Sequence, residues 1–125
     1  MAKGVIDELI TTGRVDRSWI GVFVQPVNES IASQLGMAQP AGVVVQGGYR
    51  SGPAARAGFH RYDVILDMNG TVVNDDRTLR SLLAQTPVGK PVTFQIWRQG
   101  KTVRLKAITE TRPLDNTTGR AVRGI

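Results

Sequence analysis

His60 and the serines are the residues whose types could carry out hydrolysis. Serine-type catalysis needs a nucleophile, a base and an orienting acid held close together. His60 is the only histidine, and it stands between Phe59 and Arg61 in a polar stretch. No serine has a Gly-x-Ser-x-Gly or Gly-Asn-Ser-Gly setting, and the Gly-Pro that follows Ser51 is typical of a helix start. We therefore expect no catalytic residue in this chain and a surface position for His60.

Metal and phosphate sites are not indicated either. The chain has no cysteine, and one histidine without cysteine cannot build a zinc site. Gly47-Gly48 lacks the Lys-Ser/Thr that completes a phosphate loop. Asp75 and Asp76 are interpreted as the start of a helix. We expect no cofactor and no metal.

Residues 17–24, Arg-Ser-Trp-Ile-Gly-Val-Phe-Val, contain a glycine turn that leads straight into a strand. Successive backbone N–H groups in such a turn can converge on an anion. An edge strand after it could pair with an extended peptide, and a helix bearing Leu79, Leu82 and Leu83 could form the opposite wall. On these residues alone, a buried strand after a turn remains the favoured interpretation.

The elements that must position this turn are short. Asn69-Gly70 and Gln99-Gly100-Lys101 are predicted hairpin turns. Apolar periodicity and stop signals predict helices at 5–12, 29–35, 53–57 and 76–85, and strands at 20–27, 42–46, 63–68, 92–98 and 102–108. Residues 47–52 are predicted to be a loop. This order predicts an α+β, mainly β fold, a partly open barrel or sandwich of five to six strands capped by two helices.

The 125 residues suffice for one domain with tails. No apolar run approaches the ~18–20 residues that cross a bilayer, and the first ten residues do not resemble a signal peptide. The net charge is +6, and from Arg98 onward seven basic residues face two acidic ones. An anionic partner is one interpretation. A solvated strand face and tail is favoured, because no aromatic residues are interleaved for base stacking.

The joint order of motifs resembles the PDZ domains of HtrA/Deg trypsin-like serine proteases. Residues 51–59 are similar to Ser-Pro-Ala-x-x-Ala-Gly-Leu, and Tyr62 to Gly70 are similar to Gly-Asp-Val-Ile-x-x-x-Asn-Gly. Residues 5–22 resemble the join between protease and PDZ domain. The helix, Pro-Gly turn and penultimate strand from Leu79 to Arg98 are also similar. The resemblance covers residues 5 to 108, and it implies a PDZ-like fold of the permuted bacterial type.

The resemblance also implies the roles of individual residues. The carboxylate-binding loop is Trp19, Ile20, Gly21 and Val22, with the amides of the last three as donors. Arg17 could support the carboxylate through water. The groove is implied to consist of Val24, Leu79, Leu82 and Leu83, with Ile20 and Val22 on the same side and Phe23 pointing away. Leu83 is expected to form a partly solvent-lined wall, whereas Leu79 and Leu82 could equally belong to the core.

For the whole chain, the resemblance implies a linker helix at 1–16, a PDZ domain at 17–110 and a flexible tail at 111–125. The domain would capture C-terminal or unfolded apolar peptides for a serine endopeptidase that handles misfolded proteins. The implied parent is homotrimeric, lies in the bacterial periplasm or is anchored to the cell envelope, and contacts this domain through its protease domain. A PDZ module of a scaffold, an intramembrane protease or a secretion protein is the alternative. Nucleic-acid binding is not expected.

Three details remain: one concerns a turn that is not implicated in the groove, and two concern the groove itself. Tyr62 replaces the family's glycine, so that turn must accept a Cβ. Pro26 cannot donate a ladder bond in the groove strand. Ile125 is an apolar residue of the kind the groove should take, and we expect it in a PDZ groove, a neighbour's rather than its own. A linker without such a contact is the favoured alternative.

Overall fold

The computed structural model describes residues 18–113 and 124–125. The described helices are α2, α3 and α4, at Glu29–Leu35, Pro53–Ala57 and Asp76–Ala84. The strands β1 to β8 are Ser18–Trp19, Val22–Pro26, Val43–Gly48, Val64–Met68, Thr71–Val72, Pro91–Arg98, Lys101–Ile108 and Glu110–Thr111. None of the helices in this part of the chain is long and apolar enough to cross a membrane.

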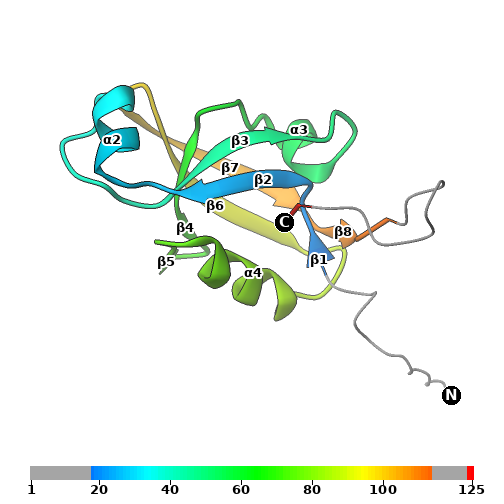
Figure 1. The fold of residues 1–125 in the computed structure, drawn as a ribbon. Helices are drawn as coiled ribbons and strands as arrows, with labels where there is room; N and C mark the ends of the chain where they lie inside the picture. Colours follow the sequence, from blue (N-terminus) through cyan, green and yellow to red (C-terminus); the bar gives the residue numbers. More distant parts are fainter. Residues whose placement is uncertain (1–17, 114–123) are drawn as a thin grey trace, which may run out of the picture.

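The strands form one larger and one smaller antiparallel sheet. The larger sheet has the order β2-β3-β4-β6-β7, with β5 paired to β4, so β2 lies at an edge. The smaller sheet pairs β1 with β8. In Figure 1, α4 lies on the opposite side of the molecule from α2 and α3. This arrangement confirms the predicted mainly β fold.

Two tight turns set the strand register as the sequence predicts. Asn69 and Gly70 join β4 to β5 with φ values of 52° and 87°, and Gln99 and Gly100 join β6 to β7 with 50° and 84°. Positive φ at both central residues matches the right-handed twist of the flanking strands. The long β6–β7 hairpin runs from the Pro91–Ile108 pair to the Arg98–Lys101 pair.

The helix ends follow their capping residues. Asn28 accepts a hydrogen bond from the Ile31 amide at the start of α2, and Gly36 ends that helix with φ 84°. Asp75 accepts from the Thr78 amide at 2.7 Å at the start of α4. This bond stabilises the charged carboxylate, so the pKa of Asp75 is lowered. The predicted positions of both helices are confirmed to within one residue.

Two apolar clusters fill the interior. The smaller cluster, called the α2 cluster here, has Val27, Ala32, Val44 and Val64 as its buried members. The larger cluster is called the groove cluster. Its buried members are Ile20, Val22, Val43, Val45, Ala54, Ile65, Met68, Val73, Leu79, Leu83, Val92, Phe94, Ile96, Ala107 and Ile125.

Several predicted boundaries were wrong. The strand expected at 20–27 is interrupted at Gly21, which has φ 79°. β3 continues to Gly48, into the predicted loop, because Gly47 and Gly48 pair with the start of β2. Thr111 belongs to β8, although the flexible tail was predicted from that residue onward. The predicted helix at 5–12 and the linker at 1–16 lie outside the described residues.

Tyr62 stands where the proteins that the sequence resembles usually have glycine, and it adopts a left-handed backbone conformation. Its φ is 74°, a region that costs most residues about 1–2 kcal/mol. The Tyr62 amide donates to the Val45 carbonyl at 2.7 Å, and the Arg61 guanidinium lies 5.0 Å from the tyrosine ring centroid. The turn therefore accepts a Cβ, as the sequence requires.

Candidate functional site

The turn at residues 18–22 is fixed on both sides before it meets any ligand. Ser18 and Trp19 pair with Thr111 and Glu110 in the smaller sheet. The Ser18 hydroxyl donates to the Thr86 carbonyl just beyond α4. The turn is thereby attached to the last strand on one side and to the end of α4 on the other.

Gly21 is required where the chain bends. With φ 79°, a Cβ at this position would lie 3.1 Å from the Trp19 ring. Trp19 is 3% exposed, and its ring centroid lies 5.3 Å from that of Tyr49. Trp19 thus supports the turn from behind. Phe23 is partly exposed and also packs against Tyr49, with ring centroids 5.6 Å apart.

The peptide groups of the turn are oriented by bonds to their carbonyls. The Ile20 carbonyl accepts from the Ala54 amide at 2.9 Å, and the Gly21 carbonyl accepts from the Tyr49 amide at 3.0 Å. A trans peptide bond places its N–H opposite its C=O. Because these carbonyls are bound on the α3 side, the N–H groups of Gly21 and Val22, which share their peptide groups, are presented on the other side.

Two amides of the turn converge on the oxygen of Ile125. The Ile20 and Gly21 amides donate to the Ile125 oxygen at 2.8 and 3.1 Å. The Ile125 amide donates to the Val22 carbonyl at 2.7 Å. Figure 1 shows the C-terminus beside the start of β2. Ile125 therefore bonds to the edge of β2 through its backbone, and Val22 participates through its carbonyl.

The side chain of Ile125 enters an apolar slot between the turn and α4. Ile20, Leu79 and Leu83 are at most 1% exposed, and Ile125 is 4% exposed in the same cluster. Val24 and Leu82 pack against this cluster from partly exposed positions. The expectation of a partly solvent-lined Leu83 was wrong for this state, because Leu83 is buried when Ile125 is in place.

The structure thus brings together most of the residues singled out by sequence, namely Trp19, Ile20, Gly21, Val22, Val24, Leu79, Leu82 and Leu83. Arg17 lies outside the described residues. Ile125 contacts the turn of its own chain. The sequence analysis favoured a linker without such a contact and, if a groove were occupied, expected a neighbour's.

Sequence reasoning missed Arg112, whose Nη1 donates to the Gly124 carbonyl at 2.7 Å. No local pattern marks a contact between residues so far apart in sequence.

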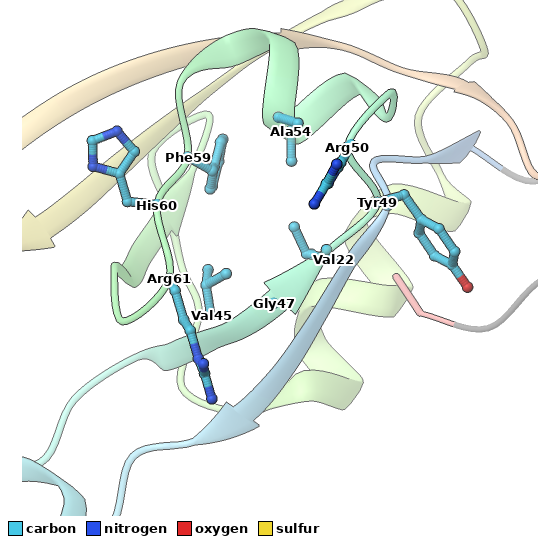
Figure 2. Close-up of a pocket in the computed structure, with 12 residues that line it drawn as sticks. Val22, Val45, Gly47, Tyr49, Arg50, Ala54, Phe59, His60 and Arg61 are labelled. Carbon is cyan, nitrogen blue, oxygen red and sulfur yellow. The ribbon is translucent and has the colours of Figure 1, made fainter.

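A separate cavity of about 230 Å³ lies between α3 and the β2–β3 pair. Figure 2 shows Ala54 and Phe59 on one side of it and Val22 and Val45 on the other. Arg50, His60 and Arg61 also line it. Because the amides of Ile20 and Gly21 point to the opposite side of the turn, this cavity is not the slot that holds Ile125.

Asp63 is a buried carboxylate with a structural role. It is 1% exposed and accepts from Arg98 Nε at 2.8 Å, Arg98 Nη2 at 2.7 Å and the His60 amide at 2.8 Å. The hydrogen bonding of Arg98 to the Asp63 carboxylate raises the pKa of Arg98. Arg98 also donates to the Gly58 carbonyl at 2.9 Å. The pair connects the end of α3 to β4 and β6.

His60 is exposed, as predicted, and contacts Asp63 through its backbone amide. The described residues contain no group of three or more His, Cys, Asp or Glu side chains that could hold a metal ion.

Comparison with known proteins now defines the family. Residues 18–109 match the PDZ domain family, and the chain belongs to it. The chain is 40% identical over 114 residues, 91% of its length, to a "Probable periplasmic serine endoprotease DegP-like" of Brucella suis. It is 36% identical over 115 residues to the protein of the same name in Rhizobium meliloti. The chain spans less than a quarter of the length of these relatives.

Solved structures show the same likeness. The HtrA-type protease AlgW with a decapeptide superposes with a TM-score of 0.73 at 37% identity, covering 79% of this chain and 30% of that one. The HtrA3 PDZ domain bound to a phage-derived ligand has a TM-score of 0.66 over 75% of this chain and 86% of that one. At 19% identity it supports the fold alone. The resemblance to HtrA/Deg PDZ domains is thereby confirmed.

Proposed function

We propose that this chain is the peptide-recognition module of an HtrA-type periplasmic serine endoprotease. It would bind C-terminal or unfolded apolar segments as an added strand beside β2, with a carboxylate held by the Ile20 and Gly21 amides. The proposal rests above all on the convergence of these two amides on the oxygen of a residue whose apolar side chain fills the adjacent slot. The peptide-bound AlgW structures support it by similarity.

The edge position of β2 suits this role. An unpaired strand edge is a template for another strand, and β2 has β3 on only one side among the described strands. α4 lies along β2 and closes the slot. Backbone pairing supplies affinity for many sequences, whereas the slot selects the last side chain.

The wider setting is also a proposal. The relatives' names support a parent in the periplasm. The homotrimeric parent, the contact with its protease domain and the anchorage to the cell envelope rest on family resemblance. We further propose that this chain does not itself hydrolyse peptides, since His60 is exposed and contacts Asp63 only through its backbone.

The test uses peptides that end in Ile or Val, each made as the free acid and as the amide. Titration into the 125-residue chain is expected to give micromolar affinity, about −8 kcal/mol, for the acids. The amides should bind much more weakly, because the turn amides then lose a charged acceptor. Equal binding of both forms would contradict carboxylate capture.

A further inference from the structure

We infer that Gly124 and Ile125 act as an internal ligand of this groove, so that external peptides bind by displacing them. The inference builds on the proposed function. In a polypeptide that ends at Ile125, these two residues would occupy the slot. A measured peptide affinity would then include the free energy needed to displace them.

The backbone contacts reproduce what a short added strand would make. Ile125 accepts from two turn amides and donates to the Val22 carbonyl, at 2.7 to 3.1 Å. These are ordinary lengths for strong hydrogen bonds. The groove's own donors and acceptor are therefore satisfied by the chain itself.

The side chain contributes as much as the backbone. Ile125 is 4% exposed and belongs to the same buried cluster as Ile20, Leu79 and Leu83. A terminal apolar residue loses nearly all contact with water here, which is the main favourable term in burial. A peptide with a similar last residue would need the same space, so both cannot be bound at once.

Gly124 fits a position that excludes most other residues. Its φ is 99°, and a Cβ on it would lie 2.8 Å from the Val22 carbonyl oxygen. Glycine accepts both the conformation and the close approach. Arg112 then holds the Gly124 carbonyl at 2.7 Å. The last two residues are thus anchored through the peptide group between them, through the Ile125 oxygen and through the Ile125 side chain.

The covalent connection explains why the chain's own groove is occupied. Thr111 pairs with Ser18 in the smaller sheet, directly before the turn. Arg112 and Gly124 are 12 positions apart, so the segment starts and ends beside the same turn. A short linker of this kind gives an effective concentration of about 1 mM. At lower protein concentrations, the internal contact wins over a neighbour's.

The expected size of the effect follows from this concentration. If residues 124–125 as a separate ligand had a dissociation constant of about 100 µM, only about one tenth of the grooves would be open. External peptides would then bind about tenfold more weakly than to an open groove.

The experiment compares three forms of the 125-residue chain: the unchanged chain, Ile125→Asp and Ile108→Asp. The control Ile108 is 58% exposed at the end of β7, and its side chain belongs to neither apolar cluster. The probe is a dye-labelled peptide with the sequence of residues 120–125, Arg-Ala-Val-Arg-Gly-Ile, and a free carboxylate. We expect Ile125→Asp to bind it about tenfold more tightly than the other two forms. Equal affinity of all three would overturn the inference.

A second measurement needs no external peptide. Hydrogen exchange of the Ile125 amide, followed by NMR, should show protection in the unchanged chain, because this amide donates to Val22. The protection should be independent of protein concentration. Exchange at the rate of a free tail would overturn the inference, and so would protection that rises with concentration, which indicates a neighbour's groove. A protected Ile125 in a chain that binds no peptide would instead contradict the proposed function alone.

Discussion

The α2 cluster and the groove cluster are both buried, but they are covered in different ways. The α2 cluster is covered by a helix that directly follows β2 and is capped at both ends. In the groove cluster, one buried member beside Leu79 and Leu83 of α4 is Ile125, at the end of the polypeptide. A helix held by covalent neighbours on both sides cannot leave without unfolding, whereas a chain end held by few hydrogen bonds can exchange. The comparison shows that two side chains can be equally buried although one of them can leave its position much more easily than the other.

Adjacent residues of β4 test whether both clusters are structural. Val64 belongs to the α2 cluster and Ile65 to the groove cluster, and both are 0% exposed. We expect Ile65→Ala to lower the free energy of unfolding by about 2–5 kcal/mol. Val64→Ala should cost less, because it removes fewer buried carbons. Urea denaturation measures both. A cost below 1 kcal/mol for Ile65→Ala would show that the groove cluster is not a structural core.

Adding the probe peptide to destabilised variants tests whether Ile125 or α2 can be replaced by an external ligand. A ligand at 100 times its dissociation constant stabilises the protein by about 2.7 kcal/mol. We expect this full gain for Ile125→Asp, measured as a shift of the urea midpoint on adding the probe peptide. Leu35→Ala, which affects a residue packed on the α2 cluster, should gain less, since its groove is still occupied by Ile125. Equal stabilisation of the two variants by the peptide would show that Ile125 is no more exchangeable than α2.

The turn glycine offers a finer test with a matched control. Gly21 and Gly70 have similar φ values, 79° and 87°, but only Gly21 has the Trp19 ring within reach of an added Cβ. Each Gly→Ala change should cost about 1–2 kcal/mol in backbone strain. Peptide affinity should fall only for Gly21→Ala. If Gly70→Ala weakens binding equally, the Gly21 effect reflects general destabilisation and not the turn.

The smallest expected effect concerns the cap of α4, which forms the groove wall. The pKa of Asp75 is lowered from 3.8, chiefly by the Thr78 backbone amide. Its contribution to stability is therefore present above the unfolded pKa and is lost as the pH falls through the folded one. Asp75→Ala should lower the melting temperature slightly at pH 7. The difference from the unchanged chain should become smaller at strongly acidic pH, where only a neutral carboxyl oxygen can cap the helix. A difference of the same size there would contradict a charged cap.

The elements that could be predicted from the sequence are those whose boundaries are set by residues close together in the chain. Asn28, Gly36 and Asp75 define their helix ends through bonds within a few residues, and the predicted helices at 29–35 and 76–85 were confirmed to within one residue. The two-residue strands β1 and β8 escaped prediction, because two residues carry no periodicity. The contact between Arg112 and the Gly124 carbonyl joins residues 12 positions apart, so no local sequence pattern predicts it.

The burial of Leu83 could not be foreseen for a similar reason. A helical face of leucines predicts an apolar wall, but the wall's exposure depends on what occupies the slot. The preference for a neighbour's groove neglected the proximity of Thr111 to Ser18. The smaller sheet had not been predicted, so the short path back to the turn was not evident.

The pairing of β1 with β8 also has a mechanical consequence. The chain enters at Ser18 and leaves at Thr111, and these two residues are partners at the same end of an antiparallel ladder. A force that pulls Ser18 and Thr111 apart would break the hydrogen bonds between β1 and β8 one after another, starting at this pair, and not all at once. The next residue after Trp19 is Ile20, whose amide binds the carboxylate oxygen. A pulling force of this kind would therefore open the peptide-holding turn before it reached the larger sheet.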